Sequence, residues 1–164
     1  VLNRKFCEAG FGGGIVNGWT ELEVKHIRNG KVIKTRKVYD KVVTTAFVND
    51  IVDALKGDAT PYANFKNYKY HGSGTGTGNE AVSNVNLGAE VGIRVAGSQE
   101  EGTANTYKSV GTVTYSSSNA ITEHGLFNAA TDGTLMDRTK FPAINVIADD
   151  SIQFTFTIEF TAGG

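Results

Sequence analysis

Residues 151–160, SIQFTFTIEF, alternate strictly between apolar and polar side chains. The even positions are Ile, Phe, Phe, Ile and Phe, and the odd positions are Ser, Gln, Thr, Thr and Glu. Successive side chains of a β-strand point to opposite faces of its sheet, so this period of two predicts a strand with one buried face. Asp149 and Asp150 before it predict a turn. The stretch therefore indicates a β protein.

Working outward, similar runs separated by Gly, Asn or Asp predict further strands at 106–116, 120–129, 133–141 and within 144–164. Residues 62–70 alternate well enough to predict another strand. Twenty glycines and two prolines are typical of a β protein with many turns. We expect a mainly β fold, an antiparallel β-sandwich of jelly-roll-like form with one short α-helix.

The first half begins with a predicted hairpin. Leu22, Val24 and His26 share one strand face, and Asn29-Gly30 is a strong type I′ turn signal because both residues tolerate a positive φ. Residues 31–43 carry Lys and Arg on both faces, which predicts an edge strand where lysine discourages unwanted pairing. Nucleic-acid binding is the less favoured interpretation, because no aromatic residues suited to base stacking alternate with these charges.

Residues 44–58, TTAFVNDIVDALKGD, predict the one helix. Apolar residues three to four positions apart form a single stripe, and Asp50 and Asp53 lie on the solvated side. Thr44 or Thr45 can cap the start, and Gly57 suits the position after the end. The stripe consists of Phe47, Val48, Ile51, Val52 and Leu55.

The sequence predicts an extended glycine-rich arm over residues 1–18, followed by a single β-sandwich domain over 19–164. The arm lacks periodicity and has no evident way to bury its large apolar side chains by itself. We therefore expect it to gain order by lying on another protein. The predicted assembly contacts are Phe11, Ile15, Val16 and Trp19.

Charge is divided unevenly along the chain, although the formal net charge is only −1. Residues 1–70 hold twelve Lys and Arg against seven Asp and Glu, whereas residues 71–164 hold four against ten. Such a division is typical either of head-to-tail contact between copies or of two faces of one solvated domain. The net charge and the lack of a long apolar run predict neither a nucleic-acid nor a membrane partner. A single cysteine, Cys7, favours a reducing compartment.

The stretch HGSGTGTG at residues 71–78 raises the question of a phosphate-binding loop. A Walker loop needs GxxxxGK[ST], and here no lysine lies between Lys69 and Lys108. The dinucleotide pattern GxGxxG also fails, because Thr77 and Asn79 stand where the third glycine is required. We interpret the stretch as a strand end followed by a flexible connection.

No catalytic, cofactor-binding or metal-binding set is predicted. His26 lies on a buried strand face and is interpreted as a hydrogen-bonded core residue, and roles for His71 and His124 stay open. Glu123 and His124 are adjacent in a strand, so their side chains point to opposite faces and do not meet. Two acidic pairs, Glu100-Glu101 and Asp149-Asp150, are interpreted as solvated turns. A glycan hydrolase assembled from distant strands remains the enzymatic alternative.

The second half resembles small virion structural proteins of tailed bacteriophages. The resemblance covers about residues 68–164 and is carried by Ala120–Phe127 (AITEHGLF), Leu135–Phe141 (LMDRTKF) and Ile144–Phe154 (INVIADDSIQF). The hairpin and helix of the first half are similar to those that precede this module.

This resemblance implies a non-enzymatic capsid decoration (cement) protein, a homo-oligomer of trimeric type that binds the major capsid protein. It implies a location in the virion after assembly in the cytoplasm of a bacterial host. A tail, baseplate or fibre-base component is the alternative within the same class. A carbohydrate-binding module is a more distant one, with Trp19 and the tyrosines of residues 62–70 as candidate platform.

Overall fold

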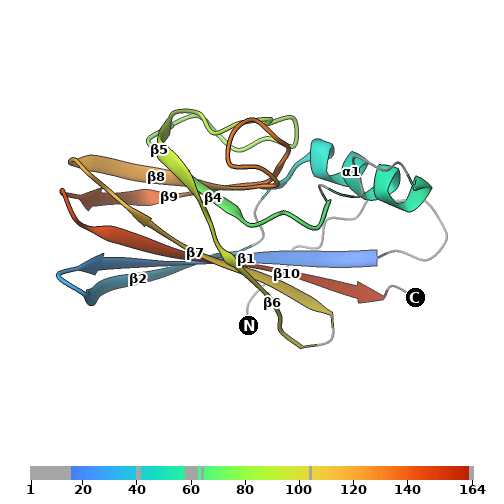
Figure 1. Ribbon diagram of the computed structural model, residues 1–164, viewed down its shortest axis with the longest axis horizontal. Coiled ribbons are helices and arrows are strands. Elements are labelled where there is room, and N and C mark those ends of the chain that lie inside the picture. Colours follow the sequence, from blue (N-terminus) through green and yellow to red (C-terminus); the bar gives the residue numbers. More distant parts are fainter. Residues whose placement is uncertain (1–15, 40–41, 58–62, 64, 104, 163–164) are drawn as a thin grey trace.

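The computed structural model describes residues 16–39, 42–57, 63, 65–103 and 105–162. Within these ranges the chain forms two five-stranded antiparallel sheets and one helix, and the sheets are stacked as two layers (Figure 1). The expected antiparallel β-sandwich is confirmed, while its narrower description as a jelly roll stays a prediction. The first sheet has the order β2-β1-β10-β7-β6 and the second has the order β3-β9-β8-β4-β5.

The strands of the first sheet are β1 (Val16–Arg28), β2 (Lys31–Tyr39), β6 (Ser98–Glu101), β7 (Thr106–Thr114) and β10 (Ser151–Ala162). Those of the second are β3 (Val42–Val43), β4 (Tyr70–Gly74), β5 (Glu90–Ala96), β8 (Asn119–Phe127) and β9 (Leu135–Val146).

The alternating stretch at residues 151–160 lies in β10, at the centre of the first sheet. Its side chains at Ile152, Phe154 and Phe156 are fully buried and Ile158 nearly so, whereas Phe160 is 39% exposed. β10 pairs with β1 along nearly its whole length. The inward side chains of both strands form the main core together with apolar residues of β8 and β9. The alternation thus correctly predicts the buried face.

The predicted hairpin is confirmed at Asn29 and Gly30, whose φ values are 50° and 71° as a type I′ turn requires. β2 is an edge strand as its charges predict, and among the described strands it pairs only with β1. The predicted strand reached Val43, but β2 ends at Tyr39, because Val42 and Val43 form β3 and pair with β9 in the second sheet. The register of the β1–β2 pairing shifts between His26 and Ile27. Lysines and a bulge both protect an open sheet edge against further pairing.

The predicted helix is α1 (Thr45–Lys56), capped by Thr44 and ended by Gly57 in the left-handed conformation. Its stripe is covered only in part, contrary to expectation: Phe47 is buried, but Val48, Val52 and Leu55 are 50%, 58% and 84% exposed. The remaining face packs near β9 at one end of the sandwich (Figure 1). No helix among the described residues is long and apolar enough to cross a bilayer.

Three further strand predictions need correction. The strand expected over 62–70 begins only at Tyr70, because Tyr68 is fully buried against Phe47 of α1 with ring centroids 5.0 Å apart. Two strands were expected, one at 133–141 and another from 144 onward. The structure instead has one strand, β9, that runs without a break from Leu135 to Val146. Pro142 is tolerated there because it lies in the bulge where the β8–β9 register shifts.

Two strands, β5 and β6, are not predicted from the sequence. Gly92 has a φ of 72°, so the polar-apolar alternation of β5 is broken within the strand. β6 has the polar sequence SQEE, with all four residues exposed. Glu100 and Glu101 therefore belong to an edge strand and not to a turn.

The boundary of the predicted arm also moves. Val16, Asn17 and Gly18 were assigned to the arm, but they are the start of β1 and pair with Ala162, Thr161 and Phe160. Sheet structure thus begins before Trp19.

We expect Phe154→Ala to lower the free energy of unfolding by about 3–5 kcal/mol, because it opens a cavity between the two sheets. The Phe154 ring lies against His124 and Phe141 and is fully buried. Urea unfolding followed by circular dichroism measures the change. The neighbouring Gln153→Ala is the matched control, for which a change within about 0.5 kcal/mol is expected; equal losses in the two variants would contradict this account of the core.

Candidate functional site

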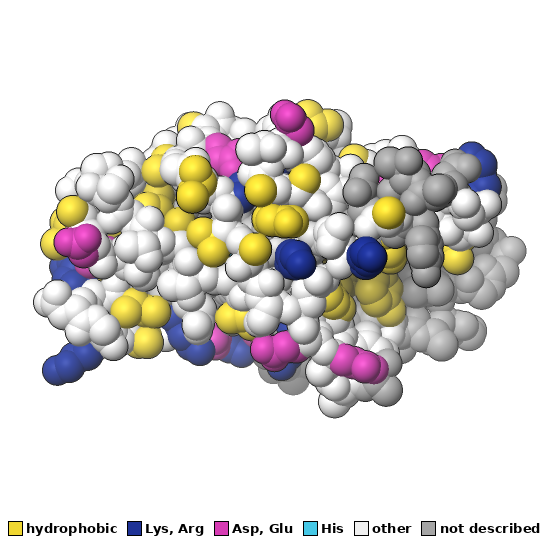
Figure 2. All heavy atoms as spheres, viewed as in Figure 1, with side chains coloured by type: hydrophobic (Ala, Val, Ile, Leu, Met, Phe, Trp, Pro, Cys, Tyr) yellow, Lys and Arg dark blue, Asp and Glu magenta, His cyan; other side chains and the backbone are white. Residues whose placement is uncertain are grey.

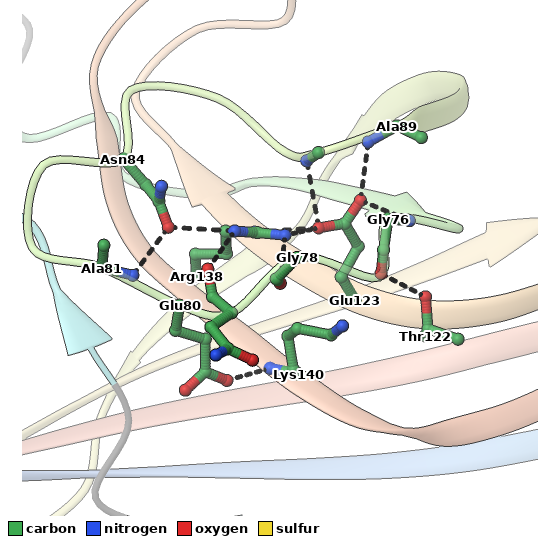
Figure 3. Close-up of polar contacts among 12 residues, drawn as sticks. Gly76, Gly78, Glu80, Ala81, Asn84, Ala89, Thr122, Glu123, Arg138 and Lys140 are labelled. Carbon is green, nitrogen blue, oxygen red and sulfur yellow. Dashed lines mark hydrogen bonds and ion pairs between the residues drawn. The ribbon is translucent and has the colours of Figure 1, made fainter.

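The glycine-rich stretch continues from β4 into a loop, residues 75–89, that lies over Glu123 of β8 (Figure 3). Three backbone N–H groups of this loop donate to the Glu123 carboxylate. Those of Gly76 and Ala89 lie 2.9 and 2.8 Å from Oε1, and that of Gly88 lies 3.1 Å from Oε2. Glu123 is fully buried, so these donors replace water around its charge.

Arg138 of β9 completes the shell around the carboxylate. Its Nε and Nη2 atoms lie 2.8 and 2.7 Å from Oε2 of Glu123. The rest of the guanidinium donates to the loop, to the carbonyl oxygens of Gly78 and Asn79 and to the side-chain oxygen of Asn84. Arg138 is 3% exposed. Both buried charges are therefore compensated, and their remaining hydrogen bonds hold the ends and the middle of the loop against the sheet.

Strand geometry explains why these two side chains meet. Glu123 pairs in register with Lys140, so Arg138 is its diagonal neighbour two residues along β9. A register shift between Ile121 and Glu123 reverses the alternation of β8, so that Ile121 lies in the main core and Glu123 faces the loop. The next residue, His124, then points back between the sheets, as the sequence predicted for this adjacent pair.

Two of the glycines are required by space. A Cβ atom at Gly76 would lie 2.3 Å from Oε1 of Glu123, and one at Gly74 would lie 2.4 Å from the carbonyl oxygen of Ala89. Both distances are far below van der Waals contact. The repeated glycines thus let the backbone approach the carboxylate closely enough for N–H donation.

The electrostatics of Glu123 follow from this shell. Burial by itself raises the pKa of the carboxyl, but hydrogen bonds from Ala89, Gly88, Arg138 and Gly76 together hold its pKa below the usual value. Glu123 is accordingly charged at neutral pH. The loop does gather N–H donors around an anion, but that anion is the protein's own carboxylate. The expected strand end is confirmed, and the expected flexible connection is wrong, because this loop is held at many points.

A second polar group lies between the sheets, where His71 of β4 meets His124 of β8. Nδ1 of His71 is 2.9 Å from Nε2 of His124, and Nε2 of His71 is 2.9 Å from the hydroxyl oxygen of Ser109 on β7. Nδ1 of His124 has no hydrogen-bond partner among the described residues. An unpaired acceptor costs less than an unpaired N–H, so we assign the Nε2–H tautomer to both rings. His124 then donates to His71, and His71 donates to Ser109.

A third buried group corrects the interpretation of Asp149-Asp150. Asp149 has the positive φ of a turn residue, 68°, as expected, but Asp150 is 1% exposed rather than solvated. It accepts from Arg28 and from His26, whose Nε2 is 2.8 Å away. The Arg28 hydrogen bond, opposed by burial and aided by His26, holds the pKa of Asp150 well below its ordinary value. His26 is the hydrogen-bonded core residue that was predicted.

The predicted assembly contacts are only partly described. Phe11 and Ile15 lie outside the described residues, and Val16 is the first residue of β1. Trp19 is half-buried, and its Nε1 donates to Glu159 across the strand pair at 2.5 Å.

Of the aromatic residues named for a carbohydrate platform, Tyr62 lies outside the described residues, and the described ones, Trp19, Tyr68 and Tyr70, are buried or half-buried. Tyr68 is buried and its hydroxyl donates to Asp50 at 2.5 Å, so Asp50 is not simply solvated as expected. Tyr70 is half-buried against the small cluster of Leu87, Phe127 and Leu135 beneath the loop.

Sequence reasoning singled out Glu123 and His124 but found neither of their partners. No three His, Cys, Asp or Glu residues of the described part of the chain lie together in a way that could hold a metal ion. The polar groups described above link strands to one another and hold the loop in place.

Comparisons with protein-family models, with curated proteins and with solved structures give no match.

We expect Glu123→Gln to lower the free energy of unfolding by about 3–5 kcal/mol, because it leaves the Arg138 charge buried without its partner. Hydrogen exchange at the amides of Gly76, Gly88 and Ala89 should accelerate at the same time. The control is Asp53→Asn, which removes an exposed ion pair with Lys56 of α1 and should cost less than about 1 kcal/mol. Unchanged amide protection in Glu123→Gln would show that the loop is held by other contacts.

The histidine pair predicts how stability depends on pH. Burial lowers the pKa of His71 to about 3, and burial together with the neighbouring His71 lowers the pKa of His124 well below its usual value. Both folded-state pKa values lie below the unfolded value of about 6.5, so the unfolded chain binds more protons at mildly acidic pH. The two neutral histidines therefore make their full contribution to the stability of the folded protein above about pH 6.5, and this contribution is lost as the pH falls.

Each histidine contributes a slope of at most about 1.4 kcal/mol per pH unit below that point. Urea unfolding at pH 7, 6 and 5 measures this slope before the carboxylates titrate. We expect His124→Gln to roughly halve it, because one of the two titrating rings is gone. A slope identical to that of the unsubstituted protein would rule out the pair as its source.

Proposed function

We propose that this protein is a structural component of a tailed-phage virion, specifically a capsid decoration protein that binds the major capsid protein as a homo-oligomer, a trimer. The proposal rests on the resemblance of residues 68–164 to such proteins and is supported by the sandwich fold. The observation that carries it is the uncovered apolar face of α1. This face consists of Val48, Val52 and Leu55, which are 50%, 58% and 84% exposed.

Another exposed apolar residue, Val82, lies beside the start of the helix. The N–H of Thr45, at the start of α1, donates to the carbonyl oxygen of Val82 at 2.8 Å, and the Val82 side chain is 60% exposed. Figure 2 shows further hydrophobic side chains in small groups over the face in view, separated by polar ones. A group of exposed apolar side chains rimmed by polar residues is typical of a surface that another protein covers.

The distribution of charge supports contact between copies. β2, one edge of the first sheet, carries the exposed residues Lys31 and Lys34, while β6 at its other edge carries the exposed residues Glu100 and Glu101. Opposite charges at two edges favour a contact in which unlike surfaces of neighbouring copies meet. Closed rings such as trimers follow when the rotation between copies closes.

The buried ionisable groups are consistent with a structural role. Glu123, Arg138 and Asp150 are bonded within the protein and are at most 3% exposed. The same surfaces would also serve a tail, baseplate or fibre-base component, and the binding experiment distinguishes these locations.

The test measures binding of the purified protein to empty heads and, separately, to tails of the phage that encodes it. We expect saturable binding to heads, and at least tenfold weaker binding for the double variant Val52→Asp with Leu55→Asp, since charges then replace apolar contacts. Val32→Asp, an equally exposed valine on β2, is the matched control and should bind normally. Sedimentation of the unsubstituted protein tests the trimer.

Removal of residues 1–15, which leaves β1 intact, tests the arm as a tether to the head. Binding only to tails would move the protein to the alternative location. Binding to neither particle would overturn the virion role altogether.

A further inference from the structure

An apolar hollow opens at the end of the sandwich beneath α1. Its volume is about 260 Å³, and its main lining residues are Phe47, Phe65, Tyr68, Met136, Ile158 and Phe160. A shallower hollow of about 540 Å³ adjoins it and shares Phe160, Tyr107 and Gln99 with it. Figure 2 shows this end of the molecule at the right, where hydrophobic side chains lie exposed below two basic ones.

The inner hollow suits an aromatic side chain. Pockets for drug-sized ligands begin at roughly 300 Å³, so this one is closer to the size of one or two side chains. Phe47 stacks on Phe65 with centroids 5.9 Å apart, and Tyr68 meets both rings edge-on at 5.0 and 6.1 Å. A further ring can join such a cluster in edge-to-face contact.

Phe160 is more exposed than its position in β10 predicts. It is 39% exposed, although the other apolar residues of β10 that alternate with it are buried. Its direct cross-strand partner is Gly18, which has no side chain to cover it. The exposed ring of Phe160 and the inner hollow together form one continuous apolar surface.

We propose that in the free protein this surface is occupied by the chain's own amino-terminal segment, residues 1–15, with Phe11 in the hollow. The segment enters the first sheet at Val16, which pairs with Ala162 two residues beyond Phe160. Phe11 lies five positions before Val16, a reach of up to about 17 Å. Glycines at positions 10, 12, 13 and 14 surround Phe11 and let the backbone reverse direction there.

The charges of the segment favour the acidic rim on balance. The outer hollow is bordered by Glu100 and Glu101, both exposed, and the segment carries Arg4 and Lys5 against the single acidic residue Glu8. Exposed ion pairs of this kind contribute little affinity, but they favour one orientation of the segment along the rim.

The covalent link favours the chain's own segment over that of a second copy. A flexible tether of this length holds its end at an effective concentration in the millimolar range, far above that of neighbouring copies in dilute solution. The inference concerns the free chain and does not depend on the proposed virion role.

The single cysteine, Cys7, provides the test in the full-length protein. Glu101→Cys places a second thiol on the rim, and mild oxidation should then give an internal disulfide, seen as a faster-migrating monomer on a non-reducing gel. Lys37→Cys is the control. Lys37 is exposed on β2, at the sheet edge opposite β6, and pairs with Glu23, about 23 Å along β1 from Val16, so that Cys7, with a reach of about 30 Å from Val16, can also arrive there.

Phe11 is tested in the Glu101→Cys background. Phe11→Ala should slow disulfide formation about tenfold, because it removes the buried anchor, while Phe6→Ala should change the rate less than twofold. Phe160→Ala should slow the reaction as well, and the two losses should not add, since both substitutions break one contact.

Three results would overturn the proposal. A dimer linked between Cys7 of one copy and the introduced cysteine of another would show that the segment of a second copy fills the hollow. Equal rates for Glu101→Cys and Lys37→Cys would show a segment with no preferred site. An unaltered rate in Phe11→Ala would exclude Phe11 as the anchor. Because no capsid takes part, these results are separate from those of the head-binding experiment.

Discussion

The arrangement of the second sheet depends on one buried carboxylate. Glu123 is enclosed by three backbone N–H groups from the two ends of the loop and by Arg138, whose remaining donors bind the middle of the same loop. Removal of either charge would leave the other in a low-dielectric environment without compensation. The loop in turn covers the apolar cluster of Phe127 and Leu135, so that one ion pair joins β8, β9 and a glycine-rich segment without regular structure of its own. This local closure makes the outer face of the sheet a second, smaller core.

The sequence predicted those elements whose signals are local. The alternation of β10, the Asn29-Gly30 turn, the edge position of β2 and the caps of α1 are all confirmed. Each depends on residues close together in the chain. The failures involve distant partners: β5 and β6 lack alternation, and β9 continues through Pro142 because a bulge accommodates it. Tyr68 was assigned to a strand, but tertiary packing beneath the helix decides its conformation.

The same distinction applies to the candidate site. Rejection of a phosphate loop needed only the spacing of glycines and lysines, and the opposite orientation of Glu123 and His124 followed from strand geometry. Nothing in the sequence connects Glu123 with Arg138, or His71 with His124, because these contacts require the register of β8 against β9 and β4. The sequence similarly predicts a solvated turn residue at Asp150. Its hydrogen-bond partners in the structure, His26 and Arg28, lie more than a hundred positions earlier in the chain.

The pairing of β1 with β10 also has a consequence for how the protein forms in the cell. The central pair of the first sheet joins the earliest described strand to the latest one, with Val16 opposite Ala162. A ribosome must therefore release nearly the whole domain before this sheet can close, and until then β1 and β2 have no permanent neighbour on their inner side. Such topologies fold slowly, since distant segments must meet before their contacts stabilise them. The emerging chain exposes hydrophobic strand faces during that interval, which makes it a natural client for chaperones.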